Sequence, residues 1–388
     1  MPDGSFHTIH PDPEALAAFN HTGFAEPPPE PQMPGLARKG RGAVTNPASR
    51  YDHQTAARSD DGWSFLTGDE LTLPPLPTTL ERDHSRSAIA WNDSPDIGFD
   101  RAVNPYRGCE HGCIYCYARP SHAFLGYSPG LDFETRLVYK PDVAALLEKE
   151  LGKPGYQPAT LALGSNTDPY QPVERTLRLT RSVLEVLERF QHPCTIVTKS
   201  AGVVQDIDLL QRLAERNLVR VWLSVTTLDP VLARTMEPRA STPARRLQAI
   251  RQLSDAGIPA AVLAAPMIPA LNDMELERIL EAAHRAGARH AGYVLLRLPL
   301  ELRDMFTAWL NEHVPDRARR VLAMIRETRN GALNDSTFGK RFIGQGPYAD
   351  LLAQRFGRMK RQLGFAGREP LDATQFRVPG RAEQLALL

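Results

Sequence analysis

Three of the four cysteines of this protein stand in one short run, Cys109-Glu-His-Gly-Cys113-Ile-Tyr-Cys116, here called the cysteine loop. Their gathering within eight of 388 positions indicates a ligand set rather than scattered core thiols. Three thiolates can bind three irons of a cubane iron–sulfur cluster, whereas electron-transfer clusters close all four corners with Cys. The fourth iron would stay open to a substrate or a cofactor, which indicates chemistry at the metal.

The spacing of these cysteines, with Tyr115 before the third, resembles the signature of the radical S-adenosylmethionine (SAM) superfamily. The flanking residues 104–109 and 116–119 look like those of its spore photoproduct lyase branch, often called DNA repair photolyase-like. The resemblance covers roughly residues 101–297 and is strongest at the cysteines. It implies a [4Fe–4S] cluster held by Cys109, Cys113 and Cys116, with SAM bound at the open iron.

The same resemblance implies an enzyme. Reductive cleavage of SAM would give a 5′-deoxyadenosyl radical that abstracts hydrogen from an unidentified substrate, and a reductant such as flavodoxin or ferredoxin would supply the electron. The alternative is a zinc-stabilised nucleic-acid-binding or scaffold protein without catalysis. His111 or His122 would then complete a Cys3His set. Structural zinc sites usually pair two short knuckles, and the sequence has no second one.

Composition fits a soluble globular protein, with 42% hydrophobic and 23% charged residues. No apolar run approaches the roughly 20 residues that cross a bilayer, so no membrane partner is expected. The N-terminus lacks the basic start and apolar core of a signal peptide. We expect a cytoplasmic protein, because thiols stay reduced in that compartment.

Short apolar strands alternate with helices from about residue 100, which predicts parallel β/α units. About six units fit before residue 297, fewer than the eight of a TIM barrel. This count agrees with the partial (β/α)6 TIM-type barrel that the resemblance implies, and an open doubly wound sheet is the alternative. The expected strands are 133–139, 159–163, 194–198, 218–225, 260–265 and 290–296, and the expected helices are 141–151, 176–190, 206–214 (capped by Asp206), 243–255 and 273–286.

Two extensions are expected to flank the barrel at 86–300. Residues 1–85 are rich in Pro and Gly and predict an irregular N-terminal extension. Within it, residues 39–43 indicate a flexible tether, with phosphate contact as the alternative. Residues 301–388 predict a helical, basic C-terminal region with helices at 302–312, 315–328 and 348–363.

Basic residues concentrate in the segment from Arg317 to Arg361, which holds eleven Lys or Arg against three acidic residues. This segment is a candidate for binding nucleic-acid phosphates. A solvated helix face is the alternative. Arg355, Arg358 and Arg361 recur at threefold spacing and would share one helix face.

Ligands of parallel β/α folds gather where strands end at their carboxyl side. The turn at 164–174 follows one such strand and is rich in short polar side chains. It looks like the family position that contacts the methionyl group of SAM, with Ser165 and Asn166 as the best candidates and Asp168 as an acceptor for an ammonium. An Asx-type turn at the start of a helix is the alternative.

The next two strand ends supply further candidates. Lys199 is placed to pair with the SAM carboxylate and matches the family pattern, with a solvated Lys as the alternative. Ser224 resembles the residue that reaches the SAM ribose, and Thr226 is second to it. Beyond them, Glu237 and Arg239 are expected to pair with each other or with a ligand.

Two tyrosines flank Cys116 in the cysteine loop. Tyr115 is expected to pack near the adenine of SAM. Tyr117 matches a tyrosine that the spore photoproduct lyase family uses as a hydrogen-atom relay, and an aromatic that shields the cluster is the alternative. The family also carries a hydrogen-donor Cys where this sequence has Leu163. Cys194 begins a different strand, roughly 17 Å from Lys199, and is expected to lie in the core.

Overall fold

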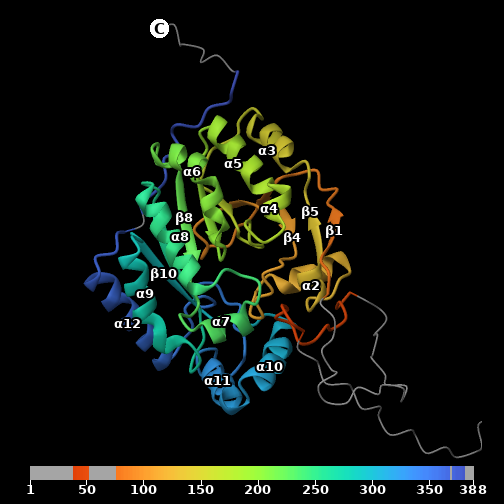
Figure 1. Ribbon diagram of the computed structural model, residues 1–388, viewed down its shortest axis with the longest axis vertical. Coiled ribbons are helices and arrows are strands. Elements are labelled where there is room, and N and C mark those ends of the chain that lie inside the picture. Colours follow the sequence, from red (N-terminus) through yellow and green to blue (C-terminus); the bar gives the residue numbers. More distant parts are fainter. Residues whose placement is uncertain (1–37, 52–75, 368, 381–388) are drawn as a thin grey trace, which may run out of the picture. The chain divides into compact units, whose positions relative to one another are not determined.

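The computed structural model describes residues 38–51, 76–367 and 369–380. Its main sheet has the strand order β10-β9-β8-β7-β6-β3-β2 (Figure 1). All neighbours are parallel except the edge pair β2–β3, and no ladder in the described part of the chain joins β10 to β2. The six parallel strands confirm the predicted partial barrel. The strands are β2 (Ile89–Trp91), β3 (Arg101–Val103), β6 (Leu161–Leu163), β7 (Cys194–Thr198), β8 (Val219–Ser224), β9 (Ala260–Met267) and β10 (His290–Leu295).

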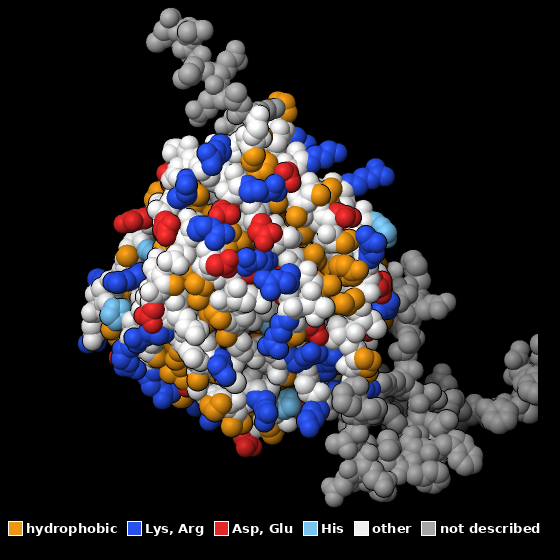
Figure 2. Space-filling view, turned by 45° about the horizontal axis from the view of Figure 1, so that its top comes forward, with side chains coloured by type: hydrophobic (Ala, Val, Ile, Leu, Met, Phe, Trp, Pro, Cys, Tyr) orange, Lys and Arg blue, Asp and Glu red, His pale blue; other side chains and the backbone are white. Residues whose placement is uncertain are grey.

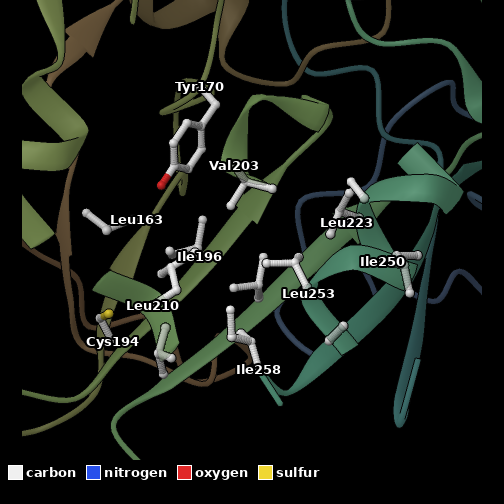
Figure 3. Close-up of a cluster of buried hydrophobic side chains, with 14 of the residues drawn as sticks. Leu163, Tyr170, Cys194, Ile196, Val203, Leu210, Leu223, Ile250, Leu253 and Ile258 are labelled. Carbon is white, nitrogen blue, oxygen red and sulfur yellow. The ribbon is translucent and has the colours of Figure 1, made fainter. Parts of the chain in front are cut away.

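Helices connect successive parallel strands and bury their apolar sides against the sheet. Figure 3 shows this core, in which Cys194 is fully buried, as expected. Asp229 accepts hydrogen bonds from Val231 N and Leu232 N and so caps α7. The connecting helices are α3 (Val143–Leu151), α4 (Glu174–Leu177), α5 (Leu179–Arg189), α6 (Ile207–Ala214), α7 (Pro230–Met236), α8 (Pro243–Asp255) and α9 (Leu276–Arg285).

The expected cap of α6 is wrong. Asp206 precedes this helix but makes no capping hydrogen bond. Its buried carboxylate accepts instead from Tyr170 Oη at 3.1 Å and Arg181 Nη1 at 2.9 Å. A buried carboxylate needs such partners, because an unpaired charge is costly to bury.

The strand expected at 133–139 is also partly wrong. Asp132–Thr135 forms a short helix, α2, and only Arg136–Tyr139 is a strand, β5. That strand lies in a separate sheet with β1 (Thr79–Arg82) and β4 (Tyr106–Arg107). The first strand of the barrel is therefore β3, which ends shortly before the cysteine loop.

The three expected C-terminal helices are present as α10 (Leu302–His313), α11 (Pro315–Glu327) and α12 (Pro347–Gln362). The first two share an apolar cluster with the cysteine loop, in which Phe306 and Trp309 join Ile114 and Tyr115. α12 instead packs against α9 on the outside of the barrel. No helix in the ranges described here has the length and hydropathy needed to cross a membrane.

Candidate functional site

The cysteine loop lies between β4 and a 3-10 helix, η2 (Arg119–Leu125), with Cys109 and Cys113 buried and Cys116 partly exposed. Burial raises the pKa of Cys109, and the charges of Asp168 and of the other two cysteines raise it further. Burial likewise raises the pKa of Cys116, and the nearby Lys199 ammonium opposes that rise. The thiol charges therefore act on one another, and the Lys199 ammonium acts on Cys113 and Cys116.

A zinc site at these cysteines is not supported. Within residues 38–51, 76–367 and 369–380, no three His, Cys, Asp or Glu side chains converge as ligands of a single ion. His111 Nδ1 lies 3.3 Å from Asp168 Oδ2, and the His122 ring packs on Tyr127 and Phe133. A cubane cluster takes one thiolate at each bound iron, so its ligands need not meet at one point. Three Cys without a fourth ligand fit that cluster.

Arg119 anchors the cysteine loop through hydrogen bonds to the loop's backbone. It is fully buried, and its guanidinium donates to Cys113 O at 2.8 Å and Gly112 O at 3.1 Å. It also donates to Pro129 O and Gly130 O and pairs with the fully buried Glu134. A guanidinium offers five N–H donors in a rigid fork, which is why one side chain can fix two loops.

The segment at residues 41–46 packs against the same loop. Glu134 accepts from Gly42 N at 3.0 Å and Ala43 N at 2.8 Å. Gly42 passes so close that a Cβ there would stand 1.8 Å from Gly112 O. The interpretation of residues 39–43 as a flexible tether is therefore wrong for Arg41–Ala43, which are buried. The rest of the expected extension lies mainly outside the described residues.

The 164–174 turn begins with a glycine that the fold requires. Gly164 has φ +84°, and a Cβ there would lie 2.1 Å from Val197 O on the adjacent strand. Ser165 Oγ accepts from Asn104 Nδ2 at 3.0 Å, and Asn166 N donates to Asn104 Oδ1 at 3.1 Å. Both Ser165 and Asn166 are partly exposed, and the Ser165 carbonyl accepts from Tyr117 Oη of the cysteine loop.

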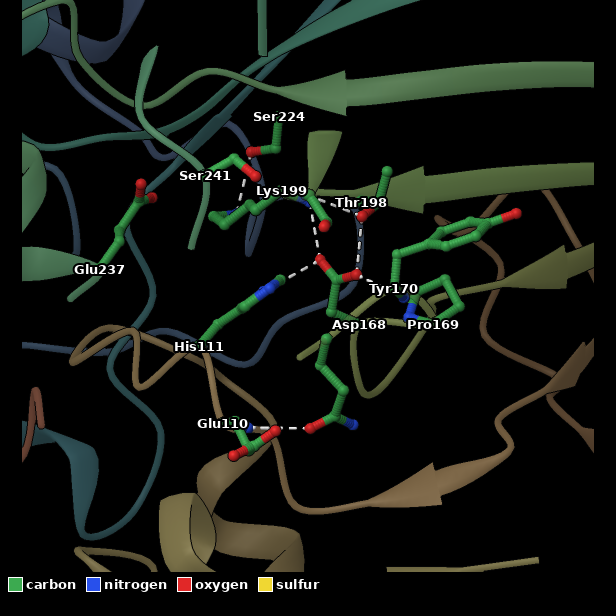
Figure 4. A network of polar contacts seen from close by, with 12 residues as sticks. Glu110, His111, Asp168, Pro169, Tyr170, Thr198, Lys199, Ser224, Glu237 and Ser241 are labelled. Carbon is green, nitrogen blue, oxygen red and sulfur yellow. Dashed lines mark hydrogen bonds and ion pairs between the residues drawn. The ribbon is translucent and has the colours of Figure 1, made fainter. Parts of the chain in front are cut away.

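Asp168 ties the turn to the next strand end (Figure 4). It accepts from Tyr170 N at 2.9 Å, Thr198 Oγ1 at 2.7 Å and Lys199 N at 2.7 Å, and His111 approaches its other side. Burial raises its pKa, but His111 and these donors outweigh burial and hold the pKa at about 2. A carboxylate has about four acceptor positions, and all are filled, as in the Asx-turn alternative.

Lys199 and Ser224 meet at neighbouring strand ends, as Figure 4 shows. Lys199 Nζ donates to Ser224 Oγ at 2.9 Å and lies 5.5 Å from the ring centroid of Tyr115. Ser224 Oγ also donates to Ala265 O at 2.9 Å. An ammonium has three donors, and one is used within the described residues. The others remain available to an anionic ligand.

A buried polar network lies behind these groups. Thr226 is fully buried, with its hydroxyl 3.1 Å from Tyr115 Oη and 2.6 Å from Glu237 Oε1. Tyr115 donates to Glu237, whose partner is the buried Arg246. Of the two alternatives for Glu237 and Arg239, pairing with each other is wrong, because Arg239 pairs with Glu110 at 3.0 Å. Thr226 and Tyr115 are thus joined to Glu237 and Arg246 in one buried network.

Tyr117 differs from Tyr115 in being open to solvent, with 49% of its surface exposed. Its hydroxyl donates to Ser165 O, which links the cysteine loop to the 164–174 turn. Its ring lies 5.7 Å from the guanidinium carbon of Arg297, just beyond β10.

Part of the basic C-terminal segment is engaged within the fold. Arg355, the first of the three arginines expected to share one helix face, donates to both Glu277 oxygens at 2.7 Å and is therefore already paired. α12 ends beside the start of β10, where Ala366 N donates to Arg289 O. Its exposed arginines therefore lie toward the end of the barrel opposite the cysteine loop.

The remaining surface charge is mixed. On the face shown in Figure 2, Lys and Arg are interspersed with Asp and Glu, in keeping with a formal net charge of +1. Sequence reasoning missed the residues that position the site, since each acts through a distant partner. They are Asn104, Arg119, Glu134 and Arg246. Asn104 and Arg119 stand inside the stretches that resemble the family, and this resemblance is the signal that could have indicated them.

Comparison with known proteins agrees with this geometry. The family model of the radical SAM superfamily matches residues 103–283. An uncharacterised protein of Mycobacterium tuberculosis is 37% identical over 232 residues, which cover 59% of this chain and 68% of that protein. An uncharacterised protein of Methanocaldococcus jannaschii is 28% identical over 178 residues, or 46% of this chain and 64% of that protein.

Solved structures share the fold. Spore photoproduct lyase complexed with dinucleoside spore photoproduct aligns with a TM-score of 0.53 at 17% identity, over 73% of this chain and 79% of that one. A mutant of that enzyme with bound AdoMet and the same dinucleoside aligns with a TM-score of 0.52 at 17% identity, over 73% and 78%. By its family match, its relatives and its fold, this chain belongs to the radical SAM superfamily and is a radical SAM enzyme.

Proposed function

We propose that this enzyme binds a [4Fe–4S] cluster through Cys109, Cys113 and Cys116 and cleaves SAM for hydrogen abstraction from a nucleic-acid substrate. The observation that carries the proposal is the position of Lys199, whose Nζ lies 5.5 Å from the ring centroid of Tyr115 in the cysteine loop and donates to Ser224 Oγ at 2.9 Å. When bound, the cluster supplies the electron that cleaves SAM and releases a 5′-deoxyadenosyl radical. A protein reductant such as flavodoxin or ferredoxin would deliver that electron.

The side chains at this edge divide into ligands and supports. Lys199 would pair with the SAM carboxylate, Ser165 and Asn166 would hold its amino group, and Ser224 would reach its ribose. Asp168 and Thr226, whose acceptor and hydroxyl positions are already filled, would orient Lys199 and Tyr115 instead.

The test is anaerobic reconstitution with iron and sulfide, followed by dithionite and SAM. We expect methionine and 5′-deoxyadenosine in equal amounts. Tightly bound zinc without acid-labile sulfide, or a full cluster that releases no 5′-deoxyadenosine, would reject the proposal.

Lys199→Ala is expected to weaken SAM binding about 10- to 150-fold, because it removes a charge-assisted contact to a carboxylate. Binding of SAM to the reconstituted protein, measured by equilibrium dialysis, checks this. The matched control is Lys149→Ala on α3, an exposed Lys far from the strand ends. An unchanged dissociation constant with an intact cluster would remove Lys199 from the SAM site.

A nucleic-acid substrate is supported by the fold shared with an enzyme solved with a dinucleoside photoproduct. Lesion repair itself is not proposed, because the place of the family's donor Cys is taken by Leu163, which is fully buried in β6. Whatever hydrogen atom returns to the product must come from another group.

We propose Tyr117 as that relay, since it adjoins Cys116 and is exposed at the barrel opening. Samples frozen during turnover with SAM and a single-stranded oligonucleotide should show a tyrosyl signal by electron paramagnetic resonance. The signal should narrow with ring-deuterated tyrosine and vanish in Tyr117→Phe. Its persistence in that variant would assign the radical to another tyrosine.

A further inference from the structure

Three guanidinium groups gather at the open edge of the barrel, and we call them the arginine cluster. Arg341 is paired, with its Nε 2.8 Å from Asp96 Oδ2. Arg329 is buried, and its hydrogen bonds within the described residues go to carbonyl oxygens, at 2.8 Å to Leu296 and 3.1 Å to Lys340, while the Asp335 carboxylate acts on it without direct pairing. The third member is Arg297. Among the described residues, Asp96 is the one carboxylate that pairs directly with any of the three arginines.

Within the described part of the chain, Arg297 contacts aromatic rings rather than a paired carboxylate. Its guanidinium carbon lies 5.7 Å from the centroid of the Tyr117 ring and 4.9 Å from that of Phe342. Its Nε is shut off from solvent without a hydrogen-bond partner, and none of the described residues forms an ion pair with it. Burial and the charge of Arg341 lower its pKa, and together they outweigh Tyr117 and the Asp96 carboxylate, which raise it.

Leaving a half-buried charge unpaired is costly, and native structures usually avoid it. A structural role between two aromatic rings is the simpler explanation, since cation–π contacts contribute about 0.5–2 kcal/mol. A cation–π role alone could be filled with every guanidinium N–H exposed to water. Here, in contrast, Nε of Arg297 is enclosed without a hydrogen-bond partner. An incoming anion that paired with the terminal Nη groups of Arg297 would offset the excess positive charge of the cluster.

We infer that Arg297 anchors a phosphate of the substrate beside Tyr117, and that the substrate is a nucleotide chain. The inference rests on the proposed function, and deepens it by naming a specificity-determining residue. The planar fork of arginine matches two phosphate oxygens. Exposed aromatic faces lie next to it, since Tyr117 is 49% exposed and Phe338, over which Arg341 stacks, is 56% exposed. Bases stack on such faces.

The position of this anchor follows from the fold. Arg297 stands two residues beyond β10, at the strand ends where Lys199 and Ser224 also lie. Tyr117 directly follows Cys116, so a nucleotide held between Arg297 and Tyr117 would sit beside the cysteine loop. The exposed arginines of α12 lie toward the other end of the barrel and would not serve the same nucleotide.

The test uses the full chain with its cluster reconstituted and a fluorescent single-stranded oligothymidylate of about eight nucleotides, the length that common single-strand sites span. Anisotropy gives the dissociation constant at about 50 and about 200 mM salt for the phosphodiester and for an uncharged methylphosphonate version. Arg297→Gln should weaken phosphodiester binding about 10- to 150-fold. It should also reduce the log–log salt slope by about 0.7, the share of one single-strand phosphate.

Two variants sharpen the result. Arg297→Lys keeps the charge and should keep the salt slope while losing part of the affinity, because an ammonium lacks the fork. Arg245→Gln removes the same charge from an exposed site on α8 and should change neither quantity. Binding of the methylphosphonate should be equal in the wild type and in Arg297→Gln.

Equal phosphodiester affinity in the wild type and Arg297→Gln would overturn the inference, as would absence of phosphodiester binding by the wild type. Arg297-dependent binding of a poly-glutamate peptide in place of the oligonucleotide would overturn the substrate class. Release of 5′-deoxyadenosine by the same wild-type preparation keeps these outcomes separate from failure of the proposed SAM chemistry.

Discussion

Replacing any one of Cys109, Cys113 and Cys116 by Ala is expected to abolish the brown colour and the acid-labile sulfide of the reconstituted protein. Each thiolate would hold one iron, and the loop offers no substitute, because His111 is directed at Asp168. The unmodified protein should contain about four irons and about four sulfides per chain. Iron and sulfide analysis, with the visible absorption spectrum, measures the loss.

Cys194→Ala is the matched control for these variants. This thiol is fully buried in β7 and belongs to the hydrophobic core. Its replacement should leave the iron and sulfide content unchanged and cost about 1 kcal/mol of stability through a small cavity. Loss of the cluster in Cys194→Ala, or a full cluster in Cys113→Ala, would contradict the ligand assignment.

Glu134→Ala is expected to lower the free energy of unfolding by about 3–5 kcal/mol, because it leaves the buried Arg119 charge without its partner. The same change frees the amides of Gly42 and Ala43 and loosens the cysteine loop. Urea unfolding of the reconstituted protein measures the loss of stability. Iron content after gel filtration should fall with it.

Glu148→Ala is the appropriate comparison. Glu148 also pairs with an arginine, Arg189 at 2.9 Å, but both side chains are about half exposed. Solvent-exposed pairs contribute about 0–1 kcal/mol. If Glu134→Ala and Glu148→Ala lower the free energy of unfolding equally, burial of the Arg119–Glu134 pair is not what stabilises the loop.

The barrel could be predicted because its signals are local. β7 and β8 are short apolar runs, and α10–α12 show helical spacing within their own sequence. The strand expected at 133–139 is wrong in its first half for the opposite reason, since only Arg136–Tyr139 forms a strand. Its residues alternate as a strand would, but Glu134 has to reach Arg119, and that partner is invisible to a local pattern.

The residues of the candidate site also differ in whether a local sequence pattern could predict them. Lys199 and Ser224 could be predicted, since each stands where a parallel strand ends and ligands gather. Arg246 could not, because its partners Glu237 and Ser224 are joined only by folding. Helical spacing correctly placed Arg355 and Arg358 on one helix. It could not show that Arg355 pairs with Glu277, because that carboxylate comes from α9.

Residues 41–46 have a bearing on how long the proposed cofactor would survive in air. Gly42 covers the backbone of Gly112. Gly130 packs equally closely on this segment, because a Cβ added at Gly130 would lie 2.3 Å from Thr45 O. These residues lie well before residue 103, where the match to the family model begins. Access of oxygen to a cluster bound at the cysteine loop would therefore be limited in part by a segment outside the matched residues.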